Sequence, residues 1–201
     1  MGTQPISPVS DKCHKIAMQP VIADPVSGLA DCYAGKKSGS CHYLRIRGAS
    51  FMPELPEIEV ARKSLTPCVT GRTISEVLVG RTQAIRNPLS DDKAFAVTLN
   101  RHRIEAIERW GKTLVFRLDG DMAVIFHFKL GANVSCHKQH VPETDGVAWN
   151  FSDGTALEFC DLALSEFHLA HNSELDHLPV LKHGTDPLAR SFNHELLKDI
   201  L

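Results

Sequence analysis

The segment from Met52 to Glu59 gathers the residue types best suited to chemistry in this chain. Its letters are MPELPEIE, so three glutamates and two prolines stand close together. Glutamate is a residue type used in general acid–base catalysis. By composition alone the segment predicts the start of a helix, because proline suits the first turn and negative charge suits the positive end of the helix dipole.

Further along the chain, three short segments carry residues that could act together with this one. They are WGKTLV with Lys112, FHFKLG with Lys129 and Leu130, and CDLALSEF with Asp161. Taken singly, each has an ordinary interpretation. A lysine at the start of a strand is usually solvated, and the two apolar segments are typical of strands in a protein core.

Taken together, these segments resemble the formamidopyrimidine-DNA glycosylase/endonuclease VIII family of base-excision DNA glycosylases. The start Met-Pro-Glu-Leu-Pro-Glu is the family's signature. WGKTLV is similar to its lysine turn, FHFKLG to its His-Leu-Gly-Met-Ser-Gly segment, and KHGTDPL at 182–188 to its Leu-Gly-Pro-Glu-Pro-Leu linker. The resemblance covers nearly all of the chain after Met52.

The resemblance implies a covalent mechanism that begins at Pro53. In this family the initiator methionine is removed, and the secondary amine of the proline attacks C1′ of the damaged nucleotide to form a Schiff base. The pKa of an α-amino group is about 8, so part of it is unprotonated at neutral pH. Glu54 would be the acid/base that protonates the sugar ring oxygen. β- and δ-elimination would then cut the strand.

The remaining site residues are also implied by the resemblance. Lys112 would contact phosphate and donate a proton during elimination. Leu130 would fill the void left by the flipped-out base, and Lys129 and Asp161 would contact DNA. The implied partner is damaged double-stranded DNA.

The position of Pro53 departs from the family pattern. Its nitrogen is in a tertiary amide with Met52, so it cannot form a Schiff base in this form. Translation that starts at Met52, or removal of the preceding residues by a protease, would free the amine. Otherwise this product is inactive. We expect a start at Met52.

The segment around Asp161 departs as well. The family's Asp-Pro-Arg-Arg-Phe-Gly loop wedges Arg and Phe into the DNA stack, whereas CDLALSEF keeps the aspartate and lacks both arginines. Leu162, Leu164 or Phe167 could act as an apolar wedge in their place. The alternative is an ordinary core strand.

The sequence ends at Leu201, about where the family's helix–two-turn–helix domain begins. That domain also carries a zinc finger with paired cysteines, and no cysteine follows Cys160. We therefore expect no metal or other cofactor in this chain. The near-neutral net charge of −2 agrees with the loss of a basic, phosphate-binding half.

The helices and strands that must position these residues are predicted from the local periodicity of apolar residues and from turn residues. Together these elements predict an α+β fold that is mainly β. An N-terminal helix is followed by an antiparallel β-sandwich with flanking helices. The predicted helices are 56–65, 90–99 (with Ser90 as N-cap), 173–178 and 191–201. The predicted strands are 73–79, 103–109, 113–118, 123–130, 147–151 and 156–159.

We divide the chain into an irregular leader at 1–51, a catalytic domain at 52–187 and the start of a second domain at 188–201. The leader is rich in Pro, Gly and Ser, without apolar periodicity. It resembles no signal peptide, and no apolar run is long enough to cross a membrane. We expect a cytoplasmic monomer, associated with the nucleoid if the protein is bacterial.

Three functions remain open at this point. The first is a bifunctional glycosylase and abasic-site lyase that acts on oxidised bases. The second is a catalytically inactive, truncated remnant of this fold that binds DNA or protein. The third is a β-sandwich binding module unrelated to nucleic acids, for which the Pro53-Glu54 match would be chance.

Overall fold

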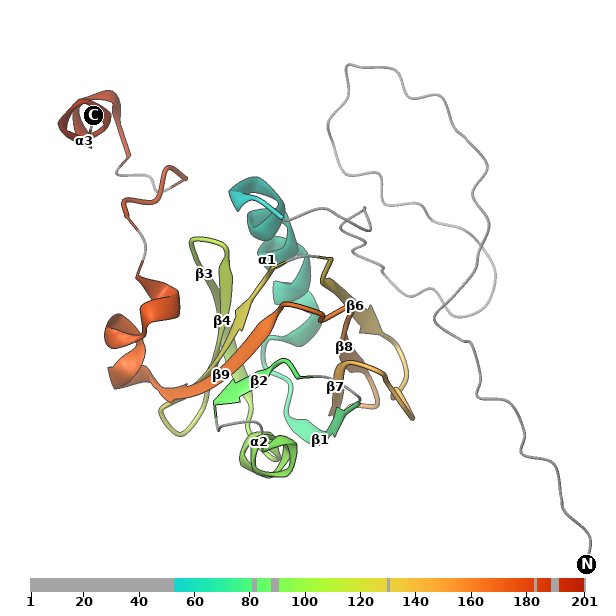
Figure 1. Cartoon of the computed structure of the whole chain (residues 1–201). Coiled ribbons are helices and arrows are strands. Elements are labelled where there is room, and N and C mark those ends of the chain that lie inside the picture. Colours follow the sequence, from blue (N-terminus) through green and yellow to red (C-terminus); the bar gives the residue numbers. More distant parts are fainter. Residues whose placement is uncertain are drawn as a thin grey trace, which may run out of the picture. The chain divides into compact units, whose positions relative to one another are not determined.

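The computed structural model describes residues 53–80, 83–87, 91–129, 131–182, 184–188 and 192–200. The predicted leader and Leu130 lie outside the described residues, so the structure does not bear on either. The described part contains two β-sheets, with the helices Leu55–Val69 and Asp92–Leu99 packed against them (Figure 1).

Helix α1 (Leu55–Val69) begins within the acidic, proline-containing segment 52–59. One face of the helix is buried, and its residues have the spacing of an amphipathic helix. They are Ile58, Ala61, Leu65 and Val69. The helix is longer than the predicted 56–65 and continues past Pro67. It ends before Gly71, whose positive φ of 82° suits glycine and whose N–H donates to the Ile104 carbonyl at 2.7 Å.

The first sheet has four strands in the order β1-β7-β8-β6, and all its neighbours are antiparallel. The second has five, in the order β2-β9-β5-β4-β3, in which only the β2–β9 pair is parallel. The strands are β1 (Ile74–Val79), β2 (Ile85–Asn87), β3 (Ile104–Trp110), β4 (Thr113–Leu118), β5 (Met122–His127), β6 (Asn133–His137), β7 (Val147–Phe151), β8 (Ala156–Cys160) and β9 (Glu166–His171).

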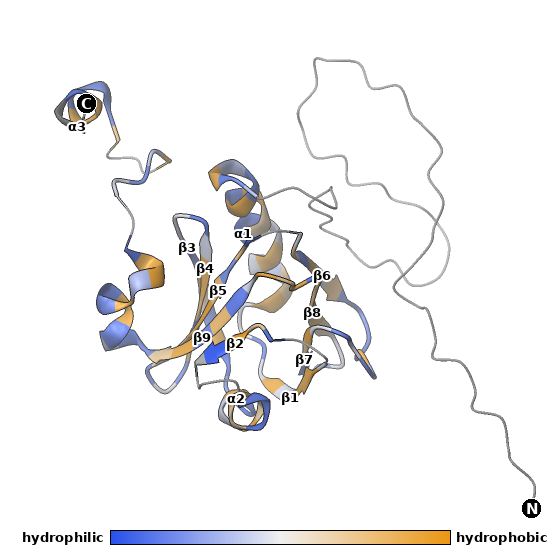
Figure 2. Cartoon of the chain, in the orientation of Figure 1, coloured by the Kyte–Doolittle hydropathy of each residue, from blue (hydrophilic) through white to orange (hydrophobic). Residues whose placement is uncertain are grey.

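An aromatic cluster fills the core shared by the two sheets. Phe126 and Phe167 of the five-stranded sheet have ring centroids 4.6 Å apart, and Phe159 of the other sheet lies 4.9 and 5.0 Å from them. Trp149 and Phe116 extend the cluster. Figure 2 shows hydrophobic colouring along many of the core strands. This buried apolar area supplies most of the stability of such a fold.

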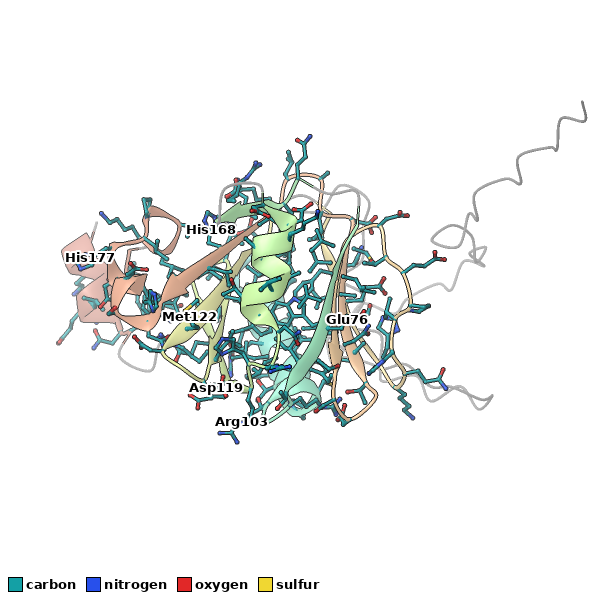
Figure 3. The ribbon with its side chains drawn as sticks, turned by 90° about the horizontal axis from the view of Figure 1, so that it is seen from below. Glu76, Arg103, Asp119, Met122, His168 and His177 are labelled. Atoms are coloured by element: carbon teal, nitrogen blue, oxygen red, sulfur yellow. The ribbon has the colours of Figure 1, made fainter. Side chains whose placement is uncertain are left out.

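Helix α2 (Asp92–Leu99) packs on β1 and β2, one strand from each sheet. In Figure 3 it lies between the strand that carries Glu76 and the strand that carries His168. Its N-cap is Asp91, whose carboxylate accepts from the Ala94 N–H at 2.9 Å. The prediction of Ser90 as N-cap was therefore wrong by one residue, because either side chain type can cap a helix.

The predicted class, mainly β with an N-terminal helix and a sandwich, is confirmed. Every predicted strand is present within a few residues, but β2, β6 and β9 were not predicted. The predicted helix at 173–178 is a 3₁₀ helix, η1 (Asn172–His177), followed by a second, η2 (Pro179–Leu181). The last helix is α3 (His194–Ile200). Within the described residues, no helix combines the length and apolarity needed to cross a bilayer.

Asn150 on β7 is a buried polar residue whose bonds fix the loop before that strand. Its side chain accepts from the Val141 N–H at 2.9 Å and donates to the Val141 carbonyl at 3.0 Å and to Glu76 at 2.9 Å. Replacing Asn150 with Leu would leave a buried N–H and carbonyl unpaired. We expect a loss of about 2–4 kcal/mol in the free energy of unfolding, measured by urea denaturation. Exposed Asn100→Leu is the control, and equal losses would contradict this assignment.

Candidate active site

The N-terminus of α1 is where the predicted nucleophile and acid/base lie. Pro53 is buried and Glu54 is the N-cap residue, in extended conformation with φ −94° and ψ 179°. The Glu54 N–H donates to the carboxylate of Glu57 at 3.1 Å, which fixes the backbone at the entry to the helix. The side chain of Glu54 is left exposed, so it can take part in other contacts.

Lys112 meets Glu54 at this end of the helix. The Lys112 ammonium lies 2.7 Å from a carboxylate oxygen of Glu54, although 58 positions separate them in sequence. Both side chains are partly open to solvent, so the pair adds little to stability. The structure thus places together Lys112 and Glu54, with Pro53 adjacent in sequence to Glu54.

The turn between β3 and β4 holds Lys112 in place. Trp110 and Thr113 pair across the hairpin, which leaves Gly111 and Lys112 as its two-residue connection. Gly111 has a φ of +59°, a left-handed conformation that a tight hairpin commonly requires and that glycine adopts without strain. A short, regular hairpin gives the lysine a defined starting point beside α1.

Arg109 is a residue that the sequence analysis did not single out. Its side chain is only 7% exposed and lies between two carboxylates, with Nε 3.1 Å from Glu59 and Nη2 2.6 Å from Asp186. A third nitrogen donates to the Gly111 carbonyl at 3.2 Å. One guanidinium therefore joins α1, the Lys112 hairpin and the segment 184–188. No sequence pattern marked it, because the two carboxylates that it pairs with are far away in the chain.

Hydrogen bonds from Arg62 and then Arg109 hold the pKa of Glu59 at about 2, although partial burial opposes this shift. The Arg62 bond measures 2.7 Å and lies within α1. Because the pKa of Glu59 is lowered in the folded state, its ionised form stabilises the fold at neutral pH.

The segment after β5 carries Lys129, a predicted DNA contact. Its ammonium lies 2.8 Å from Glu166 on β9, and Arg86 and His168 lie 3.4 and 3.8 Å from the same carboxylate. Although burial opposes it, the hydrogen bond from Lys129 lowers the pKa of Glu166. Burial lowers the pKa of His168, against the pull of Glu166. We call Lys129, Glu166, Arg86 and His168 the Glu166 cluster.

Asp161, the other predicted DNA contact in the described residues, begins the β8–β9 loop. It has a positive φ of 57°, and its carboxylate accepts from Asn133 at 2.6 Å. The same Asn133 amide nitrogen donates to the Gly131 carbonyl at 3.2 Å. Asp161 therefore connects this loop to the residue that follows Leu130, and the two segments predicted to contact DNA lie side by side.

The three candidate wedge residues, in this loop and at the start of β9, have different surroundings. Phe167 lies on β9 in the aromatic core, and Leu162 is buried as well. Leu164 is 53% exposed. Only Leu164, of these three, could enter a DNA stack without unpacking the core. The described residues gather no group of three or more His, Cys, Asp or Glu side chains that could hold a metal ion.

These features define a class: a β-sandwich domain with a helix at whose start Glu54, next to Pro53 in the sequence, contacts a hairpin lysine. Residues 52–163 match the N-terminal domain of formamidopyrimidine-DNA glycosylase. This match covers more than half of the chain, and the chain therefore belongs to the formamidopyrimidine-DNA glycosylase family.

Curated relatives are bacterial formamidopyrimidine-DNA glycosylases. The protein of Geobacillus kaustophilus is 35% identical over 153 residues, which are 74% of this chain and 55% of that protein. The Bacillus subtilis protein is 33% identical over 154 residues, which are 75% of this chain and 55% of that protein. The chain thus spans about half the length of the relatives it matches.

Solved structures show the same fold. The Lactococcus lactis formamidopyrimidine-DNA glycosylase in complex with an abasic site containing DNA has a TM-score of 0.63 at 22% identity, covering 74% of this chain and 55% of that one. A complex of a mutant of that enzyme with Fapy-dG containing DNA gives the same values.

The lowered pKa of Glu59 gives a prediction for stability. The pKa of an unfolded glutamate is near 4.5, so the stabilisation is complete above that pH and is lost as the pH falls towards 2. We expect Glu59→Gln to lower the melting temperature at pH 7 by about 5 °C. The gap between variant and wild type should close between pH 4.5 and 2. Glu105→Gln, on the exposed side of β3, is the control in thermal unfolding monitored by circular dichroism. A gap that stays constant with pH would refute the role of the Glu59 charge.

Proposed function

We propose that this chain is the catalytic half of a DNA base-excision glycosylase with abasic-site lyase activity on oxidised bases, acting through Pro53. The observation that carries the proposal is the 2.7 Å contact between Glu54 and Lys112 next to Pro53 in the sequence. A carboxylate and an ammonium at hydrogen-bond distance can exchange a proton, which both glycosidic cleavage and elimination require. The solved relatives bound to DNA support the substrate class.

The first step would be nucleophilic attack. With Pro53 as the first residue, its secondary amine attacks C1′ of a nucleotide rotated out of the duplex, since C1′ is not accessible in the stack. The base leaves with the proton that the amine gives up, and Glu54 protonates the ring oxygen, so that the C1′–O4′ bond opens and an iminium remains on the sugar. The bond between the Glu54 N–H and Glu57 would hold the peptide that links Pro53 to the start of α1.

The second step would be elimination. The iminium makes the C2′ proton acidic, and its removal expels the 3′ phosphate by β-elimination. Lys112 would donate a proton or contact a phosphate, since 34% of its side chain is open to solvent beside Glu54. A second elimination would release the 5′ phosphate.

Damaged double-stranded DNA is the proposed partner. Leu164 would insert between bases, while Lys129 and Asp161 would lie near the backbone from neighbouring segments. Leu130 would fill the gap left by the rotated base.

A catalytically inactive remnant that binds DNA is the second candidate. One feature favours it: the β8–β9 loop presents Leu164 where the family pattern has arginine-rich sequence. In addition, the Pro53 nitrogen is in an amide bond in the chain as given. A remnant would bind abasic DNA without cutting it.

Covalent trapping tests the role of Pro53. We expect the chain that starts at Pro53 to form a borohydride-stable complex with abasic-site DNA, seen as a shifted band in denaturing gels. The chain that starts at Met1 should form none, because its Pro53 has no free amine. Equal trapping by both would show that a lysine reacts instead. No trapping by a folded Pro53 chain, together with DNA binding, would favour the inactive remnant.

The variant Glu54→Gln separates the role of the acid/base in base excision from the role of the nucleophile in covalent trapping. We expect it to lower excision of an oxidised base by about 100-fold or more, the size of a general acid–base contribution, while trapping on a ready-made abasic site is less affected. Glu105→Gln is the matched control on the neighbouring strand. If Glu54→Gln leaves the rate of excision unchanged, the result would support a binding module that has no glycosylase activity.

Leu164→Ala tests the DNA contact. Burying a leucine side chain contributes about 1.5–3 kcal/mol, so we expect affinity for abasic duplex to fall by about 10-fold or more in a gel shift or anisotropy titration. Val97→Ala is the control, since Val97 is an exposed apolar residue on α2. Unchanged affinity would remove Leu164 from the proposed interface.

A further inference from the structure

The side chain of Asn133, the first residue of β6, bonds to two segments that are far apart in the sequence. Its amide nitrogen donates to the Asp161 carboxylate at 2.6 Å and to the Gly131 carbonyl at 3.2 Å. The two backbones also run close together, since a Cβ atom added at Gly131 would lie 3.9 Å from the Asp161 carbonyl oxygen. One amide therefore ties the segment before β6 to the start of the β8–β9 loop.

The orientation of the Asn133 amide is set by these two acceptors. If the amide were turned over, its oxygen would face the Asp161 carboxylate and the Gly131 carbonyl, and both hydrogen bonds would be lost. In the observed orientation the amide oxygen is buried and has no hydrogen-bond partner among the described residues. Burial of an unpartnered oxygen is unfavourable, so the two bonds of the nitrogen must offset it.

The β8–β9 loop, residues 161–165, is short and is held at both ends. Asp161 has a left-handed backbone conformation, and its carboxylate accepts the bond described above. Leu162 is buried in the main core, and the Ser165 N–H donates to the Leu162 carbonyl at 3.1 Å, which closes a tight turn. The turn leaves Ala163 and Leu164 exposed between these fixed points.

We propose that Asn133 is a positioning residue for DNA binding: by tying Asp161 to the segment at Gly131, its amide holds the β8–β9 loop in the arrangement that presents Leu164 to a DNA duplex. The inference rests on the proposed function, in which Leu164 inserts between bases. A side chain on an ordered loop binds more tightly than the same side chain on a loose one, because ordering a loop during binding costs free energy. Asn133 itself needs no contact with DNA.

Hydrogen exchange of the full chain tests this tie in the absence of DNA. In Asn133→Leu we expect the backbone amides of residues 161–165 to exchange at least about threefold faster than in the wild type, measured by mass spectrometry of peptic peptides. Asn100→Leu, the same change at the exposed C-cap of α2, is the control and should leave exchange in the loop unchanged.

The variant Asn133→Leu should fold, because Asp161 is exposed and water can solvate its carboxylate when the amide is lost. We expect its melting temperature to stay within about 4 °C of the wild type. If it melts further below the wild type, Asn133→Ala, which adds no apolar bulk, replaces it with the same expectations.

A double-mutant cycle tests the link between Asn133 and DNA. We expect Asn133→Leu to lower the affinity of the full chain for an abasic duplex by about fivefold, measured by fluorescence anisotropy. In the Leu164→Ala background the same change should lower the affinity by less than about twofold, because no side chain is then left to position. A residue that only stabilised the fold would lower the affinity equally in both backgrounds.

The outcomes separate this inference from the proposed function. Equal losses of affinity in the two backgrounds, unchanged affinity in Asn133→Leu, or unchanged exchange in the loop would each overturn the role of Asn133 and leave the glycosylase proposal standing. A full chain that binds no abasic duplex at all would overturn both. Faster exchange in the loop, together with a loss of affinity that depends on Leu164, would support the positioning role.

Discussion

The arrangement of the site depends on one buried guanidinium. Arg109 is held between Glu59 and Asp186 and also bonds to the turn that carries Lys112. A buried cation is costly unless its hydrogen bonds are made, so the carboxylates and the carbonyl must stay where they are. Through these bonds the start of α1, the β3–β4 hairpin and residues 184–188 are fixed relative to one another. The short distance between Glu54 and Lys112 follows from that arrangement.

The packed interior supports this arrangement of α1 and the β3–β4 hairpin, because it holds the two sheets rigidly. Phe126, Phe159 and Phe167 pack edge to face or tilted across the sandwich, and close-packed aromatic rings resist relative sliding of the layers. The proposed catalytic residues therefore lie at the rim of a stiff core, on a helix end and a hairpin turn. Loops and element ends held by a rigid scaffold are common places for binding and catalysis.

The sequence predicted the helix start, the class of fold and most strands, because these depend on local spacing of apolar, acidic and turn-forming residues. It missed β2, which has only three residues. It also missed β6 and β9, whose polar and apolar residues alternate, because β6 has a single β-branched residue and β9 has none. It also missed Arg109 and Glu166. Their roles arise from ion pairs to residues distant in sequence, and no local pattern encodes such contacts. The proximity of Glu54 and Lys112 was likewise visible only in the fold.

The ion pairs of Glu166 affect how strongly the binding of a nucleic acid to this face would depend on salt. Two cationic side chains, Lys129 and Arg86, converge on this one carboxylate, and His168 lies beside them. A phosphate that approached them would have to compete with a carboxylate that is already in place. Affinity for nucleic acid depends on salt in proportion to the number of phosphates that a protein newly neutralises. DNA bound along this face would therefore lose less affinity with rising ionic strength than a count of its basic residues suggests.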